Sequence, residues 1–300
     1  MPTQLAIYTE SFFPKNRFKR LIKIVLGRNV RGPKQVERSL LAGLQELEYP
    51  YSYNQAALDK TAVTCVLNGV ETLAWATDQK EKGNLKKIVA GPNISILPHS
   101  DEGVLLNPNI DALITPCLWV QKAYEQDAPE LKGKVFVWPA GVTVPPLTES
   151  PKTLDFLIYN KQKDNSLAEE ITQNLQAQNF RVATITYGSF DQRDYFSILD
   201  KSRALIYLGH TESQGLAMFE AWARKVPTLV YGHHDPTGTI ASPSPYLTEA
   251  SGMFFQGVDE LKSLAEQFLQ TKFTPRNYIE QNFTHKKSAE KYLAIINQLH

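Results

Sequence analysis

Apolar and polar positions along the chain follow two rhythms that alternate from end to end. Short runs rich in β-branched residues are separated by longer segments in which apolar side chains recur every three or four positions. This pattern is typical of parallel sheets flanked by helices. In the first half it predicts strands at residues 5–9, 61–67, 87–91, 111–116 and 134–139. It also predicts helices at residues 34–46, 69–81 and 118–126.

A proline-rich segment without periodicity, residues 139–151, interrupts the series and is typical of a linker. Beyond it the alternation resumes, with strands predicted at residues 154–160, 181–188, 203–209, 226–232 and 252–255. Helices are predicted at residues 166–178, 193–201, 215–225 and 258–270, and the final stretch, 274–300, has a helical pattern throughout.

The expected fold class is α/β, with two Rossmann-like, doubly wound parallel-sheet domains that face a central cleft. We place the first domain at residues 1–145 and the second at residues 146–284. A C-terminal helix is expected at residues 285–300, and it could return to the first domain. Because ligands of such sheets bind at the carboxyl ends of the strands, candidate site residues are sought there.

Composition narrows the classes of protein that fit. Of 300 residues, 42% are hydrophobic and 21% are charged, which suits a chain with a buried core and excludes a disordered or collagen-like one. Cys65 and Cys117 lie in apolar runs and predict buried thiols, not a disulfide framework or a zinc site. The sequence has no signal peptide pattern and no apolar run of membrane-spanning length, so we expect a cytoplasmic protein.

The formal net charge of +1 predicts no general attraction to nucleic acid, but the charge is unevenly distributed. Residues 12–38 hold nine basic residues and one acidic residue, a net charge of +8, and their apolar positions recur at helical spacing. A cationic amphipathic helix can lie on an anionic membrane surface, so we expect peripheral association with the inner face of a membrane. A groove for a charged acceptor and a solvated face with a buried apolar side are the alternatives. Nucleic acid is not expected, because the aromatic residues lack a base-stacking rhythm.

The segment from His210 to Gly232 carries the most specific chemistry. A strand is predicted to lead through a polar loop containing Glu212 into a helix that Gly215 opens and that contains Glu220. Backbone N–H groups at a helix start attract phosphate, and glycine allows its close approach. Carboxylates on either side can accept hydrogen bonds from sugar hydroxyls. The pattern therefore predicts a site for a nucleoside-diphosphate sugar.

The sequence ESQGLAMFEAWARKVPTLV in this segment resembles the Glu–seven residues–Glu signature of retaining GT-B glycosyltransferases (family 4-like, group 1). Similarity extends over residues 244–269 and, more loosely, over residues 31–44 and 138–144. The resemblance implies the GT-B fold and sugar transfer with retention of anomeric configuration. It assigns Glu212 to the donor sugar and Glu220 to the ribose. The other donor-binding residues that it implies in this motif are Ser213, Gln214, Gly215, Leu216 and Ala217.

Further site residues follow from the same resemblance. Family members place basic residues just after the first strand of the second domain, where Lys161 lies nearer the strand end than Lys163. Lys161 would stabilise the charge on the leaving diphosphate. Tyr187 and Gly188 would lie near the nucleotide base, and Gly32 would admit the donor phosphates or the acceptor.

The chain has no Asp-x-Asp pattern, and His233 and His234 belong to no metal-ligand pattern, so we expect no metal and no cofactor besides the donor substrate. The predicted function is transfer of a sugar from a nucleoside-diphosphate sugar to a hydroxyl acceptor, namely a glycan, glycolipid or polysaccharide precursor, including lipid-linked ones. Many relatives have a histidine near the reacting sugar, which His99 does not clearly match. The missing histidine keeps a non-catalytic sugar- or nucleotide-binding protein open as an alternative. A sugar-nucleotide epimerase on the same fold is the other alternative, although the sequence does not reveal the acid–base residues that it would need.

Overall fold

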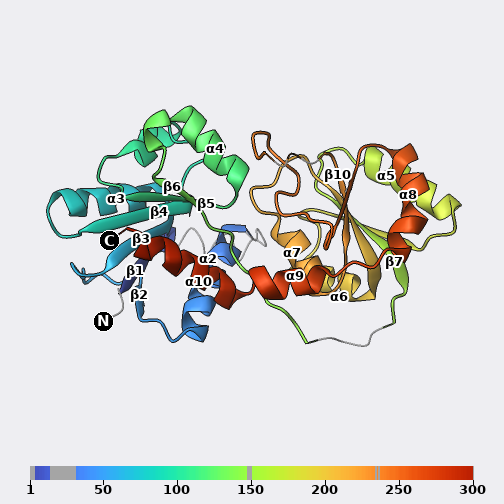
Figure 1. The fold of residues 1–300 in the computed structure, drawn as a ribbon, viewed down its shortest axis with the longest axis horizontal. Coiled ribbons are helices and arrows are strands. Elements are labelled where there is room, and N and C mark those ends of the chain that lie inside the picture. Colours follow the sequence, from blue (N-terminus) through green and yellow to red (C-terminus); the bar gives the residue numbers. More distant parts are fainter. Residues whose placement is uncertain (1–3, 14–31, 147–150, 234, 236, 300) are drawn as a thin grey trace. The chain divides into compact units, whose positions relative to one another are not determined.

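The computed structural model describes residues 4–13, 32–146, 151–233, 235 and 237–299 (Figure 1). The chain divides into two units, the first made of Met1–Gly141 with His285–His300 and the second of Val142–Thr284. The division falls at Gly141, where the sequence suggested residue 145. The chain therefore completes the second unit before its last residues return to the first.

The first unit is built on a parallel sheet with the strand order β2-β1-β3-β4-β5-β6. Its described strands are β1 (Leu5–Tyr8), β2 (Tyr51–Tyr53), β3 (Val63–Asn68), β4 (Lys87–Asn93), β5 (Ala112–Thr115) and β6 (Val135–Val137). The main helices are α2 (Gly32–Glu46), α3 (Val70–Glu81) and α4 (Leu118–Asp127). Right-handed crossovers that leave β1 in one direction and β3 in the other put α2 on the opposite face from α3 and α4 (Figure 1).

The last helix, α10 (His285–Asn297), completes the core of the first unit by packing along α2 (Figure 1). The two helices approach so closely that a Cβ on Gly43 would collide with the carbonyl oxygen of His285. The fully buried Trp138 donates its indole N–H to the carbonyl oxygen of Ser288 at 2.8 Å. These contacts tie α10 to the end of β6.

The second unit has a parallel sheet with the strand order β11-β10-β9-β7-β8. Its described strands are β7 (Leu154–Asn160), β8 (Val182–Thr186), β9 (Ser202–Leu208), β10 (Thr228–Tyr231) and β11 (Gly252–Phe255). Its helices are α5 (Ser166–Ala177), α6 (Gln192–Lys201), α7 (Leu216–Ala223), α8 (Val258–Gln270) and α9 (Pro275–Asn282). The chain runs from β7 to β8 in one direction and from β9 to β10 in the other, so the strand order reverses between the neighbours β7 and β9. Ligands of doubly wound sheets bind at such a reversal.

Alternation along the central strands sends successive side chains of the second unit into two separate cores. Leu157 and Tyr159 of β7 pack with Tyr207 of β9 against α6, α7 and α9. Phe156 and Ile158 pack on the other face against α5 and α8. Tyr207, near the carboxyl end of β9, is thereby directed to the face that α7 covers.

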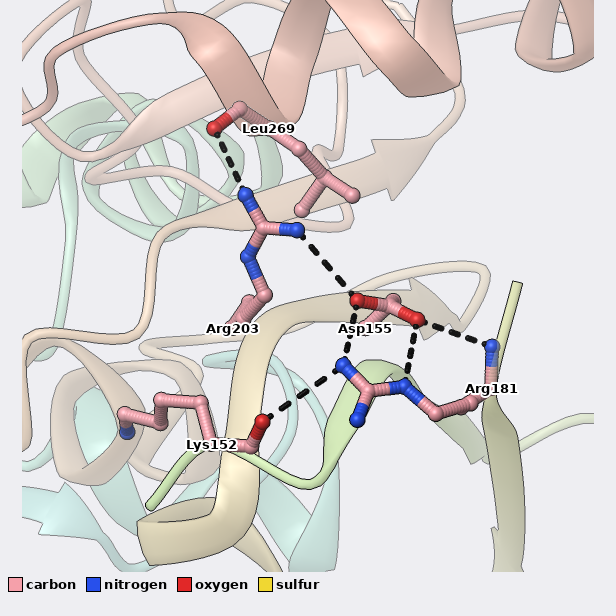
Figure 2. A network of polar contacts seen from close by, with 5 residues as sticks. All are labelled: Lys152, Asp155, Arg181, Arg203 and Leu269. Carbon is pink, nitrogen blue, oxygen red and sulfur yellow. Dashed lines mark hydrogen bonds and ion pairs between the residues drawn. The ribbon is translucent and has the colours of Figure 1, made fainter. Parts of the chain in front are cut away.

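A carboxylate joins the amino ends of β7, β8 and β9 (Figure 2). Asp155 accepts two hydrogen bonds of 3.0 Å from the Arg181 guanidinium and one of 3.3 Å from Arg203. Arg203 also donates to the carbonyl oxygen of Leu269 at the end of α8. The Arg181 hydrogen bond is the main cause that lowers the pKa of Asp155 to about 2. A cavity of about 320 Å³ opens beside this network, lined by Gln178, Phe180, Arg203, Glu266, Leu269 and Gln270.

Two sequence-based expectations about the elements need correction. The stretch 274–300 is not helical throughout, because α9 ends at Asn282 and α10 begins at His285. At the break Phe283 leaves helical geometry with a φ of −138°, and its carbonyl oxygen accepts a hydrogen bond of 2.8 Å from the backbone N–H of Val142, next to a short β-bridge between Val142 and Thr284. Strand β2 was not predicted, because it has only three residues, all half-buried, which is too short for a strand pattern to stand out. Cys65 and Cys117 are buried and unpaired, as predicted.

Candidate functional site

The turn that follows β7 is fixed by a buried amide. Asn160 ends the strand and is 1% exposed. Its side-chain amide donates to Asn165 at 2.7 Å, and its side-chain oxygen accepts from the backbone N–H of Gln162 at 3.0 Å. The backbone N–H of Lys161 donates to the carbonyl oxygen of Leu208, the last residue of β9, at 2.8 Å. These bonds bring the Lys161 side chain to the carboxyl end of β9.

Lys161 and Glu212, the two residues predicted to be catalytic, are in direct contact. The Lys161 ammonium donates to Oε1 of Glu212 in an ion pair, and the hydroxyl of Tyr207 donates to the same oxygen. The Lys161 side chain is 33% exposed and that of Glu212 is 12% exposed. The backbone N–H of Glu212 donates to the carbonyl oxygen of Ser242 at 2.9 Å, which fixes the loop that carries the carboxylate.

Tyr207 is a site residue that the sequence reasoning missed. Its side chain is almost fully buried and stacks on Tyr159, with ring centroids 5.5 Å apart and an interplanar angle of 25°. Burial, followed by the negative charge of Glu212, raises the pKa of Tyr207 well above its usual value, so the phenol keeps its proton. A Cβ on Gly209 would lie 2.6 Å from the Tyr207 ring, so a glycine at this position leaves room for the ring. The signal in the sequence was the alternation of β9, which directs residue 207 to the face beside α7.

Gly215 is the N-terminal cap residue of α7, one position before the first helical residue, whereas the sequence predicted that it is the first residue of the helix. Its φ of +81° and ψ of +50° lie in the left-handed region, which glycine adopts without the strain that a Cβ brings. The carbonyl oxygen of Gly215 accepts from the backbone N–H of Met218 at 2.9 Å, and the first turn of α7 starts from there. The Tyr195 hydroxyl donates to the carbonyl oxygen of Ala217 at 2.7 Å and fixes that turn to α6. The glycine is therefore required by the backbone of the turn itself.

Glu220 lies further along α7 and is held by a residue that was not predicted. Its Oε1 accepts a hydrogen bond of 2.6 Å from the side-chain amide of Gln192. Gln192 is the first residue of α6, which begins with a capping box formed by Asp191 and Asp194. A neutral amide at this place orients the Glu220 carboxylate without neutralising its charge.

Among the other predicted residues of the second unit, Tyr187 contacts Lys161. Tyr187, at the end of β8, is 49% exposed, and its ring centroid lies 5.1 Å from the Lys161 ammonium, a cation–π contact. Gly188 follows it with a φ of +92°. Ser213 is exposed and Gln214 is 5% exposed, while Leu216 and Ala217 are partly buried against the core. Lys163 is exposed.

Some predicted features belong to the first unit or lie outside the described residues. Gly32 begins α2 in the first unit and is exposed, so its role at the donor site stays a prediction. Residues 14–31, which make up most of the basic stretch, lie outside the described residues, as does His234. His99 pairs with Asp127 through its Nδ1 at 3.0 Å. It lies in a loop of the first unit.

The described part of the chain contains no group of three or more His, Cys, Asp and Glu side chains that could hold a metal ion. Within the same residues, no helix combines the length and the apolar character needed to cross a bilayer.

The side chains gathered around Glu212 can bind both anions and hydroxyl groups. At the reversal between β7 and β9, a cation, a carboxylate and a buried hydroxyl donor meet, and the Gly215 turn and α7 follow directly in the chain. A lysine ammonium and the N–H groups of a helix start bind anions, and a carboxylate binds neighbouring hydroxyls. The site therefore suits a ligand that joins phosphate to a polyol.

No family model and no curated protein matches this chain. Several solved structures match it in fold. The apo form of the lipopolysaccharide outer core galactosyltransferase WaaB matches with a TM-score of 0.61 at 10% identity, covering 99% of this chain and 100% of that one. Sucrose-phosphate synthase from Thermosynechococcus elongatus matches with a TM-score of 0.52 at 12% identity, covering 99% of both chains. TarM matches with a TM-score of 0.56 at 13% identity, covering 80% of this chain and 55% of that one.

These structures are GT-B glycosyltransferases, and at such identities the likeness establishes the fold alone. The expected fold class, α/β with two parallel-sheet domains of the GT-B kind, is confirmed.

Proposed function

We propose that this protein is a glycosyltransferase that moves a sugar from a nucleoside-diphosphate sugar to a hydroxyl acceptor. One observation carries the proposal. Lys161 and Glu212 are held together where the strand order of the second unit reverses, and Glu212 lies three residues before the Gly215 turn that starts α7. This is the edge of a doubly wound sheet at which nucleotides bind.

In the proposed complex the second unit binds the donor and the first unit serves the acceptor. The diphosphate lies against the backbone N–H groups from Gln214 to Ala217, next to the positive end of α7. Glu212 accepts hydrogen bonds from hydroxyls of the sugar, and Glu220 accepts them from the ribose. The base lies beside Tyr187. These positions order the donor along the carboxyl edge of the sheet.

Lys161 changes its partner in this account. In the free protein its ammonium is paired with Glu212. A bound diphosphate carries more negative charge than one carboxylate, so the flexible lysine side chain shifts toward it. The ammonium then stabilises the charge that grows on the diphosphate as the bond to the sugar breaks. Neutralisation by Lys161 and by the start of α7 is the reason we propose that no divalent metal is needed.

The finer features of the reaction are also proposals. The Glu212–Glu220 spacing resembles the retaining family, so the product is expected to keep the anomeric configuration of the donor. Proton NMR of the first product formed reads this configuration directly. Activity that persists in EDTA would support metal independence, and activity restored only by Mg²⁺ or Mn²⁺ would refute it.

A solved neighbour suggests which donors to test first. A TarM variant was solved with UDP and α-GlcNAc-glycerol, and it matches this chain with a TM-score of 0.51 at 12% identity. We propose a nucleotide-sugar donor and a glycan or lipid-linked acceptor here. UDP-sugars are therefore the first probes, followed by GDP- and ADP-sugars.

We propose a cytoplasmic enzyme that associates with the inner face of a membrane through its basic stretch, residues 12–38, which has a net charge of +8. Sedimentation with vesicles of phosphatidylglycerol and of phosphatidylcholine tests this surface. Binding to the anionic vesicles alone supports it. Equal and negligible binding to both refutes it.

The deciding experiment combines binding and turnover. A thermal-shift screen with UDP-glucose, GDP-mannose and ADP-glucose should find one donor that stabilises the protein, and Glu212→Gln should lose that stabilisation. With an acceptor extract, the wild type should release the nucleoside diphosphate and the variant should not. Binding without release would favour the non-catalytic alternative, and conversion of the donor into an epimer would favour the epimerase.

A further inference from the structure

We propose that Tyr207 is a positioning residue that keeps the Glu212 carboxylate directed at the donor sugar when Lys161 leaves it for the diphosphate. The inference rests on the proposed function and adds to it a residue that contacts no substrate. Its basis is the shared acceptor atom, because Lys161 and Tyr207 both donate to Oε1 of Glu212.

The two hydrogen-bond donors to Glu212, Lys161 and Tyr207, differ in how firmly the rest of the structure holds them. The Lys161 side chain is 33% exposed and ends a flexible four-carbon stem, so it can follow a new negative charge. Tyr207 is 1% exposed, stacks on Tyr159 and belongs to a central strand. Its hydroxyl therefore cannot move away from Glu212 without disturbing the core.

The Tyr207 phenol is chemically suited to be a permanent hydrogen-bond donor. A neutral hydroxyl that donates to a carboxylate makes a charge-assisted hydrogen bond and leaves the negative charge in place. Because burial and the nearby carboxylate raise its pKa, Tyr207 stays protonated throughout the neutral range. Glu212 thus keeps one fixed partner in both states of Lys161.

The proposed role predicts an effect confined to the sugar end of the donor. Tyr207 touches Glu212, which we assign to the sugar, whereas the nucleotide is assigned to Glu220 and the start of α7. Loss of the phenol hydroxyl should therefore weaken binding of the nucleotide sugar and spare binding of the nucleotide. A merely structural role would weaken both together.

The test uses Tyr207→Phe, which removes one oxygen and keeps the ring. Isothermal titration should use UDP-glucose, GDP-mannose and ADP-glucose together with UDP, GDP and ADP. A hydrogen bond to a charged group is worth enough to raise the Kd of the preferred nucleotide sugar about 10- to 100-fold. The Kd of the matching nucleoside diphosphate should change less than about 3-fold, near the limit of a neutral substitution.

A matched control is Tyr278→Phe, in the same unit but packed on Trp222 and Phe283 away from the site. It should leave both constants unchanged. Gly209→Ala provides a second variant, since its Cβ would push the Tyr207 ring, and it should reproduce the selective loss.

The outcomes separate this inference from the function on which it rests. A wild type that binds none of the six probes refutes the proposed function, and the inference with it. A wild type that binds a donor, with a Tyr207→Phe variant that binds it equally well, refutes the inference alone. Equal losses for the sugar nucleotide and the nucleotide would assign Tyr207 a structural role and also overturn it.

Discussion

Lys161 and Glu212 are 51 positions apart in the sequence, yet the ammonium of one donates to the carboxylate of the other. They meet because β7 and β9 are neighbours in the sheet, with Asn160 paired to Leu208 at their carboxyl ends. The pair lies at the reversal of strand order, where nucleotides bind in doubly wound sheets, so a nucleotide bound there would lie beside it. This relationship links the fold to the proposed chemistry.

Replacing Lys161 by alanine should reduce turnover far more than donor binding. The lysine is assigned to charge that develops on the leaving diphosphate, and removal of one such group lowers kcat by about 10²- to 10³-fold. Lys163→Ala is the matched control, because Lys163 is exposed two residues further along the same turn. Steady-state kinetics with the preferred donor measure both. A similar loss in the two variants would contradict the role of Lys161.

Replacing Glu220 by glutamine should remove the preference for a ribose. The amide keeps the size of the side chain but loses the charge that accepts hydroxyl protons strongly. Affinity for the nucleoside diphosphate should fall about 10-fold or more, by loss of charged hydrogen bonds. The 2′,3′-dideoxy nucleotide should bind equally to the wild type and the variant. A wild type that binds the ribo and dideoxy nucleotides equally would refute the assignment.

The helices and strands of the second unit were largely predictable from the sequence, because a local pattern of apolar residues and turn residues marks each of them. Residues 154–160 and 252–255 form strands with the predicted bounds, since both are apolar runs between turn residues. The end of α9 was not predictable in this way. Phe283 continues the helical spacing, yet α9 ends before it, and its carbonyl oxygen accepts from a backbone N–H that is distant in the sequence, that of Val142.

The site was predictable only as far as a motif reveals it. Glu212, Gly215 and Glu220 lie within one segment, and Lys161 was chosen by resemblance. Tyr207 and Gln192 were missed for physical reasons. A tyrosine in a buried strand has the pattern of a core residue, and a glutamine that starts a surface helix resembles any exposed one. Their roles depend on contacts across the sheet and between helices, which the local pattern does not encode.

The Asp155 network predicts that the folded protein loses stability over a narrow range of acidic pH. The pKa of Asp155 is lowered from 3.8 to about 2 in the folded protein, so the unfolded chain takes up the proton first as the pH falls. The stabilisation is complete above pH 4 and disappears as the pH drops through about 2. It should amount to about 1–2 kcal/mol. Urea unfolding between pH 2 and 5 should show this slope in the wild type, and Asp155→Asn should flatten it. An unchanged slope would contradict the pKa shift.

Gly215→Ala should lower the free energy of unfolding, because the backbone conformation at this position disfavours alanine. It should also weaken donor binding, because this residue forms the turn against which the diphosphate is proposed to lie. A φ of +81° disfavours alanine by about 1 kcal/mol or more. Gly133 has a φ of +83° and open space around it, so Gly133→Ala is matched in backbone strain and belongs to the first unit, whereas a Cβ on Gly215 also meets Cε of Met218 at 2.5 Å. Urea unfolding should show a loss in both variants that is larger for Gly215→Ala, and only Gly215→Ala should weaken donor binding. Loss of affinity in both would attribute the effect to stability.

The most direct measurement is a crystal structure of the protein with the donor that stabilises it most. We expect the diphosphate to lie within hydrogen-bonding distance of the Lys161 ammonium and of the backbone N–H groups that start α7. We also expect a sugar hydroxyl on Glu212, which still accepts from Tyr207, and the ribose on Glu220. A nucleotide bound elsewhere, or one whose diphosphate leaves the Lys161–Glu212 pair intact and untouched, would contradict the proposed function.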